Sequence, residues 1–152
     1  MFVNPDQTAI RAFEKGDGSP TAIPSHMAVA MAGRIVAVDP QQRGVTLAFH
    51  PGDQFLQATG VIQGGAVCAM LDFAAAFALL RVLDEGRSTA TASITVSFLR
   101  PVPKGEVIVR GFVEKNGRSL GYVRAVATSP GSNEILATAM TTLVVVGSAS
   151  SK

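Results

Sequence analysis

The apolar residues change their period along the chain, and this change predicts the order of the structural elements. Two short alternating runs, GRIVAVD and VTLAFH, flank the turn-forming segment DPQQRG and predict a strand–turn–strand hairpin. After residue 90 every apolar run is strand-like, and the tight turns between the runs predict antiparallel pairing. The predicted strands are residues 33–39, 45–50, 91–99, 106–114, 119–128 and 134–146.

Two of these segments support a more detailed prediction. Asn116-Gly117, between two late strands, supplies the positive φ angles of a type I′ turn and predicts a tight hairpin. The strand at 91–99 alternates strictly, which predicts two chemically different faces. One face carries Ala92, Ile94, Val96 and Phe98, and the other carries Thr91, Ser93, Thr95 and Ser97.

One long apolar segment lies between the hairpin and the late strands, and it predicts a buried helix. The helix is expected to begin at Gly64 or Gly65 and to end at Leu83, and it is apolar nearly all round. Its many alanines permit close approach of neighbouring backbone. The order of elements therefore predicts an α+β domain in which an antiparallel sheet wraps around one long central helix.

We expect a single domain over residues 24–146, because no linker or internal repeat interrupts this stretch. Residues 1–23 are expected to form an N-terminal lead-in with a short helix near 8–15. A second short helix is predicted from a cap at Ser25 through Met31. The small polar residues 147–152 predict a disordered tail.

The composition excludes several classes of protein. A net charge of +2 without a dense basic run argues against a nucleic-acid partner. The single cysteine excludes an intrachain disulfide, and the first residues lack the pattern of a signal peptide, so the cytoplasm is the expected compartment. Asp72 and Arg81 inside the apolar segment argue against a membrane helix. With only 16% charged and 47% hydrophobic residues, the chain is expected to bury surface against copies of itself.

Asp72 is the residue that points most directly to chemistry. Its helical neighbours, among them Cys68, Ala69, Ala75 and Ala76, cannot neutralise a carboxylate, and a charged residue is rarely buried without a partner. One interpretation is an aspartate that hydrogen-bonds to a nearby strand or loop. The other is a catalytic carboxylate that acts as nucleophile or general base.

The pair Gly64-Gly65 at the start of the helix is the second candidate. Glycines allow another molecule to approach the backbone, and the free N–H groups of a helix start can bind an oxyanion. Gly64 lies eight residues before Asp72, which corresponds to about 12 Å along a helix. One carbonyl group cannot reach both residues in one chain. If both act on one substrate, two antiparallel helices in a dimer must supply them.

A longer motif contains both candidates and resembles a known family. The motif is Gln57-x5-Gln63-Gly64-Gly65-x6-Asp72, followed by the strand 91–99 and Arg100-Pro101. It resembles the hotdog-fold thioesterases of the phenylacetate-type (PaaI-like) group, over about residues 28–146. The resemblance implies hydrolysis of an acyl-CoA to a free acid and CoA at a dimer interface, often in a dimer of dimers, that is, a homotetramer. It implies no cofactor and no metal.

The resemblance also implies a role for each residue of the motif. Asp72 of one subunit is the catalytic carboxylate, and the Gly64 N–H of the other subunit polarises the thioester carbonyl. Gln57 positions the water or the carbonyl, and Thr91 orients the water in some members. Gln63 replaces the usual histidine of the motif, and it cannot carry a proton at neutral pH.

The residues expected to bind the CoA phosphates and the acyl group are predicted less directly. Arg100, Lys115 and Arg118 are candidates for the phosphates, although each is equally typical of a solvated turn. A pocket lined partly by Phe73, Phe77 and Leu80, or by their strand partners, suits a medium-chain or aromatic acyl group.

Other functions are weighed against this one. A non-catalytic or altered acyl-CoA-binding module is the main alternative, because of Gln63. A hydratase is disfavoured, because Phe77 stands where such enzymes carry a histidine five residues after the aspartate. Cys68 is expected in the core, and His26 and His50 are expected to be structural or exposed. The chain has no Gly-x-Ser-x-Gly motif and no metal-ligand spacing.

Overall fold

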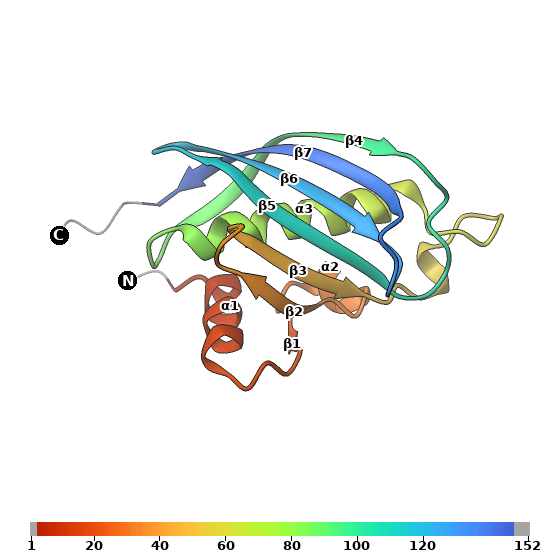
Figure 1. The fold of residues 1–152 in the computed structure, drawn as a ribbon, viewed down its shortest axis with the longest axis horizontal. Coiled ribbons are helices and arrows are strands. Elements are labelled where there is room, and N and C mark those ends of the chain that lie inside the picture. Colours follow the sequence, from red (N-terminus) through yellow and green to blue (C-terminus); the bar gives the residue numbers. More distant parts are fainter. Residues whose placement is uncertain (1–2, 148–152) are drawn as a thin grey trace.

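The computed structural model describes residues 3–147, and its single antiparallel sheet wraps around one long helix (Figure 1). The strand order is β1-β2-β3-β5-β6-β7-β4, with α3 beneath the concave face. The elements are α1 (Pro5–Lys15), β1 (Thr21–Ala22), α2 (His26–Ala30), β2 (Arg34–Asp39), β3 (Gly44–Phe49), a 3-10 turn (Asp53–Phe55), α3 (Gly64–Val82), β4 (Ser88–Phe98), β5 (Val107–Asn116), β6 (Leu120–Thr128) and β7 (Ile135–Val146). The predicted hotdog arrangement is confirmed.

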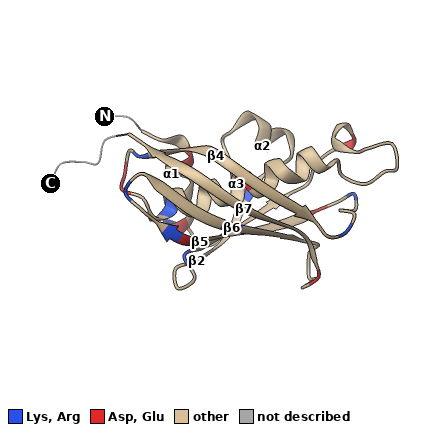
Figure 2. Cartoon of the chain, turned by 90° about the horizontal axis from the view of Figure 1, so that it is seen from above, with Lys and Arg blue, Asp and Glu red and all other residues tan. Residues whose placement is uncertain are grey.

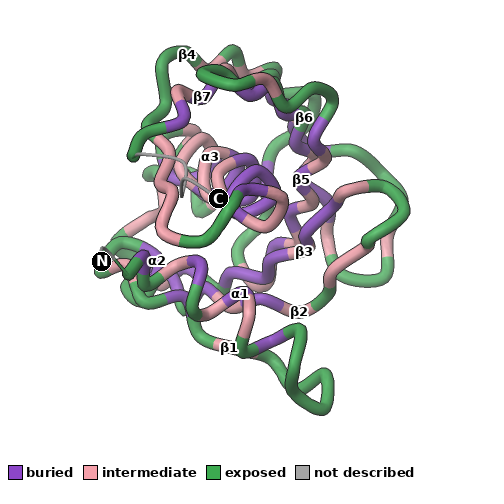
Figure 3. Tube along the Cα trace, turned by 90° about the vertical axis from the view of Figure 1, so that its left-hand side faces the viewer, coloured by how far each residue is buried: buried purple, intermediate pink, exposed green. Residues whose placement is uncertain are grey.

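The helix α3 packs closely against the sheet because glycines in β5 and β6 have no side chain between the two backbones. A Cβ on Gly111 of β5 would lie 2.1 Å from the carbonyl oxygen of Ala74, so only glycine permits this contact. Gly121 of β6 similarly admits the side chain of Leu79. Figure 3 shows the buried residues gathered on α3 and on the strands that surround it. The helix is long and apolar enough to cross a membrane, but more than half of its most apolar stretch is buried in this fold.

The segment predicted as a lead-in packs against the C-terminal half of α3. Asn4 caps α1, its side-chain oxygen accepting from the N–H of Asp6 at 2.9 Å. The buried Gln7 donates to the carbonyl oxygens of Leu80 and Asp84 and accepts from the N–H of Gly86. These bonds tie α1 to the C-terminal end of α3 and to the turn that follows it. Of the predicted disordered tail, residues 148–152 lie outside the described residues.

The hairpin between β5 and β6 is present, but the predicted type I′ turn is wrong. Neither Asn116 nor Gly117 has the positive φ angle that this turn requires. A register shift between Val113 and Lys115 leaves one residue of β5 unpaired, and as a result Asn116 pairs with Gly121. The N–H of Gly117 donates to the carbonyl oxygen of Leu120 at 2.8 Å, so the chain reverses at Arg118-Ser119 and not at Asn116-Gly117.

Candidate functional site

The N-terminus of α3 presents backbone donors that no side chain caps. Gln63 is the N-cap residue, and its side chain makes no capping hydrogen bond. Gly64 is the first helical residue, so its N–H lacks a partner within the helix. The preceding loop holds this start in place, since Gln63 N–H donates to Phe55 O at 2.8 Å and Ile62 N–H donates to Val102 O at 2.9 Å. Such a helix start favours a negatively charged or polarised oxygen.

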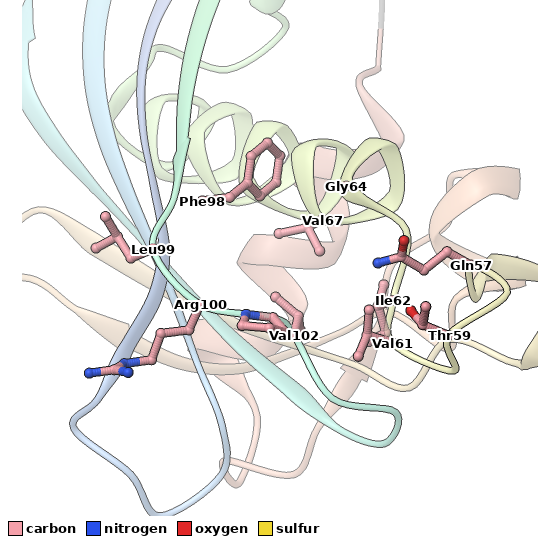
Figure 4. Close-up of a pocket in the computed structure, with 11 residues that line it drawn as sticks. Gln57, Thr59, Val61, Ile62, Gly64, Val67, Phe98, Leu99, Arg100 and Val102 are labelled. Atoms are coloured by element: carbon pink, nitrogen blue, oxygen red, sulfur yellow. The ribbon is translucent and has the colours of Figure 1, made fainter.

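This helix start opens into a pocket of about 420 Å³ (Figure 4). The pocket brings together three of the predicted site residues, namely Gln57, Gly64 and Arg100. Figure 4 shows Gln57 and Gly64 on one side, with the Arg100 side chain extending away on the other. The remaining wall is mostly apolar and is formed by Thr59, Val61, Ile62, Val67, Phe98, Leu99, Pro101 and Val102.

Asp72 and Thr91 meet at a different point on α3. The Thr91 hydroxyl of β4 donates to Asp72 Oδ1 at 2.8 Å. The two residues predicted for one site are therefore in direct contact, and the carboxylate is oriented by a neutral donor. Both residues are at least partly exposed in the single chain.

A β-bulge places Thr91 beside Asp72, and it corrects the predicted faces of this strand. Thr91 pairs with Leu143 and Ile94 pairs with Thr141, so both point to the helix side of the sheet. The register shift between Thr91 and Ser93 reverses the alternation at Ala92. Strict alternation would have turned Thr91 away from α3. The predicted shared face of Thr91 and Ser93 is therefore wrong.

Asp72 lies on a stripe of α3 that the core leaves partly exposed. The stripe consists of Gly65, Cys68, Ala69, Asp72, Phe73 and Ala76, none of which is fully buried. Its members recur every three or four residues, so they form one face of the helix. Four of the six are small, which permits close approach of another element. Burial raises the pKa of the Cys68 thiol, and the charge of Asp72 adds to the effect.

The positively charged candidates divide between the two ends of the sheet. Arg100 is at the pocket, where it pairs with Glu134 at 2.7 Å. Lys115 and Arg118 belong to the β5–β6 hairpin, which packs near Leu79 at the far end of α3. Within one chain they are not brought to the pocket. Figure 2 shows the charged residues concentrated toward the ends of the molecule.

The structure adds a cation that the sequence pattern did not single out. Lys104 follows the pocket segment and pairs with Asp53 at 2.6 Å, and its neighbour Pro103 forms a bridge with Val61 of the pocket. The sequence indicates a role for Lys104 only through its position four residues after Arg100. Among the predicted acyl-binding residues, Phe77 and Leu80 lie in the core instead, and only Phe73 is partly exposed.

The donor set does not form a metal centre. Within residues 3–147, no three His, Cys, Asp or Glu side chains come together in a way that could hold a metal ion. His26 and His50 are exposed and do not line the pocket. The chemistry available to this site is therefore that of a carboxylate, a hydroxyl, amides and backbone N–H groups.

Comparison with known families decides where this arrangement belongs. The sequence model of the Thioesterase superfamily matches residues 59–136, which is about half of the chain and includes α3 with Gly64 and Asp72. The chain belongs to the thioesterase superfamily. The predicted resemblance is thereby confirmed, and the prediction of a thioester hydrolase is confirmed at the level of the family.

Three similar proteins are consistent with this assignment to the thioesterase superfamily. A Ralstonia eutropha protein related to phenylacetic acid degradation, a thioesterase by inference, is 29% identical, with a TM-score of 0.76 over 90% of this chain and 98% of its own. A Saccharolobus solfataricus protein, an esterase by inference, is 29% identical over 99 residues, or 65% of each chain. The matching part of this chain therefore spans slightly less than two thirds of that curated relative's length. The Streptococcus mutans protein smu.793, bound to acetyl-CoA, shares the fold at 19% identity, with a TM-score of 0.65 over 74% of this chain and 87% of its own.

Proposed function

We propose that this protein hydrolyses an acyl-CoA to a free acid and CoA, using Gly64 of one subunit and Asp72 of the other. The observation that carries the proposal is the uncapped helix start at Gly64, which opens into a mostly apolar pocket. Membership of the thioesterase superfamily and the acetyl-CoA bound to smu.793 support the substrate class. The cytoplasm remains the expected compartment.

In the proposed reaction the thioester carbonyl accepts a hydrogen bond from the Gly64 N–H, which stabilises the oxyanion as it forms. Asp72 either removes a proton from the attacking water or attacks the carbonyl carbon itself, and water then hydrolyses the resulting anhydride. In both routes the C–S bond breaks and CoA leaves as the thiol. Gln57 lines the same pocket, which supports its proposed role of positioning the water or the carbonyl.

The pocket favours a medium-chain or aromatic acyl group, because its walls are mostly aliphatic with one aromatic ring. Arg100, at its rim, is the first candidate for a CoA phosphate, and Lys104 is the second. Their partners Glu134 and Asp53 are well exposed, and such surface ion pairs contribute only about 0–1 kcal/mol, so a phosphate can compete for the two cations.

The dimer follows from the separation of the two groups on α3. Gly64 and Asp72 are about 12 Å apart along the helix, so one substrate reaches both only if a second copy supplies one of them. The partly exposed stripe, four of whose six residues are small, suits an antiparallel copy of α3. A homodimer is therefore the minimum unit of the proposal, and a dimer of dimers is the expected assembly.

The proposed dimer predicts that the two Cys68 thiols face each other. If Gly64 of one copy lies opposite Asp72 of the other, the twofold axis passes midway between them, at position 68. Because this is the only cysteine, oxidation of the wild type is expected to give a disulfide-linked dimer on a non-reducing gel. Mildly alkaline pH is preferred, because the pKa of the thiol is raised.

A matched control moves the cysteine along the same stripe. In Cys68→Ser/Ala76→Cys the two thiols would be about 24 Å apart along the helices, so no crosslink is expected. Labelling with N-ethylmaleimide measures whether each thiol is accessible. An accessible Cys68 that does not crosslink would contradict the antiparallel arrangement.

Thr91 is expected to act as a positioning residue for Asp72. Thr91→Val removes the donated hydrogen bond and keeps the shape, so we expect kcat to fall by about tenfold with little change in KM. Thr91→Ser keeps the hydroxyl and should restore most of the rate. Steady-state kinetics of both variants check this, and an unchanged kcat in Thr91→Val would remove Thr91 from the mechanism.

The alternative is a non-catalytic or altered acyl-CoA-binding module, which Gln63 favours because it cannot transfer a proton. Release of CoA thiol from a panel of aliphatic and aromatic acyl-CoAs separates the two functions. Turnover that depends on Asp72 supports hydrolysis and identifies the acyl group. Acyl-CoA binding without turnover would support the module.

A further inference from the structure

The ring of Phe98 lies beside the helix start at which the thioester carbonyl is proposed to bind. Phe98 is the last residue of β4, and its side chain is 53% exposed. A Cβ placed on Gly64 would have Phe98 Cζ, Cε1 and Cε2 as its three nearest atoms, at 3.3, 3.6 and 3.8 Å. Figure 4 shows the ring beside the first turn of α3, above the pocket.

The backbone that carries this ring is held in place. The N–H groups of Leu99 and Arg100 both donate to the carbonyl oxygen of Leu136, at 2.8 and 3.1 Å. The backbone that carries the ring is therefore tied to β7, which keeps the ring next to the start of α3. Ile62, Val67 and Val102 form the buried part of the pocket wall, which has little freedom to give way.

In the proposed geometry, a carbonyl that accepts from the Gly64 N–H has its neighbouring carbon on the side of the Phe98 ring. A methylene group at that carbon is narrow, whereas a methyl branch there widens the chain directly against the ring. A branch one carbon further on lies beyond the helix start. The ring is therefore expected to disfavour an acyl group with a branch at the first carbon, and to accept one with a branch at the second.

We propose that Phe98 is a specificity-determining residue that selects acyl groups without a branch at the carbon next to the thioester carbonyl. This inference rests on the proposed function and deepens it. The expected discrimination against one misplaced methyl group is about 10–200-fold in kcat/KM. Removing the ring should abolish the discrimination, because kcat/KM for the branched substrate should rise.

The test compares the best straight-chain acyl-CoA of the panel with its 2-methyl and 3-methyl analogues. The readout is the ratio of kcat/KM values for two substrates on one enzyme sample, so losses of folded or assembled enzyme cancel. We expect the wild type to disfavour the 2-methyl substrate by at least about tenfold. Phe98→Ala should bring that ratio close to one, Phe98→Leu should give an intermediate value, and the 3-methyl ratio should stay unchanged.

Leu99→Ala is the matched control, because Leu99 is 58% exposed and lines the same pocket but is not among the nearest atoms to Gly64. It should leave the 2-methyl ratio as in the wild type. A wild type without discrimination, a ratio unchanged in Phe98→Ala, or an equal effect of Leu99→Ala would overturn this inference alone. No turnover of any acyl-CoA by the wild type would overturn it together with the proposed function.

Discussion

Replacing Asp72 with asparagine is expected to lower kcat for acyl-CoA hydrolysis by about 10²-fold or more. Asparagine keeps the shape of the side chain and can still accept the hydrogen bond from Thr91, so the fold and the orientation are retained. It removes the charge and the basicity on which both proposed routes depend. Thiol release from the best substrate of the panel measures the effect, with Asp72→Ala as a second variant.

The control for this variant is an aspartate outside the site. Asp84 follows the end of α3, and its side chain is exposed, so Asp84→Asn should leave the rate unchanged. Both Asp72 variants should keep the melting temperature within a few degrees of the wild type, because the residue is only partly buried. Hydrolysis at the wild-type rate by Asp72→Asn would show that Asp72 is not the catalytic carboxylate.

The second large effect is expected from Gly64→Pro compared with Gly64→Ala. Proline is favoured at the first position of a helix and has no N–H, so it removes the proposed oxyanion donor and keeps α3. The preceding Gln63 is already extended, with φ −60° and ψ 137°, as a residue before proline requires. Losing one oxyanion donor lowers kcat by about 10²–10³-fold.

Gly64→Ala makes this comparison specific to the N–H group. Alanine and proline both add a Cβ at about the same place beside the Phe98 ring, so any effect of that contact is common to the two variants. Only alanine keeps the backbone donor. The ratio of kcat between the two variants therefore reports the donor itself, and equal values would exclude the Gly64 N–H as the oxyanion site.

Much of the fold could be predicted because local patterns encode it. The apolar period of residues 64–83 and the alternation of the late strands each depend on a few neighbouring residues, and the elements begin and end close to the predicted bounds. The separation of Gly64 from Asp72 also follows from the sequence, because a helix has a constant rise per residue. The two candidate residues, and the need for two copies of the chain if both act on one substrate, therefore follow from the sequence alone.

Three features of the site depend on contacts between distant segments. Thr91 faces Asp72 because a bulge forms where β4 pairs with β7, and no local pattern marks its position. Lys115 and Arg118 lie at the far end of the sheet, whereas Lys104 lies beside the pocket, because strand direction and register decide which loops meet. The Phe98 ring lies against Gly64 although 34 residues separate them in the chain.

Local patterns were enough to predict the elements, the central helix and the two residues on it that are proposed to react. Which side chains surround those residues, and which face of β4 meets the helix, depends on the folded chain. The difference comes from the range of the interactions. Helix rise and strand alternation are set by adjacent peptide units, whereas a bulge, a register and a pocket wall depend on pairing and packing between segments that meet only in the folded chain.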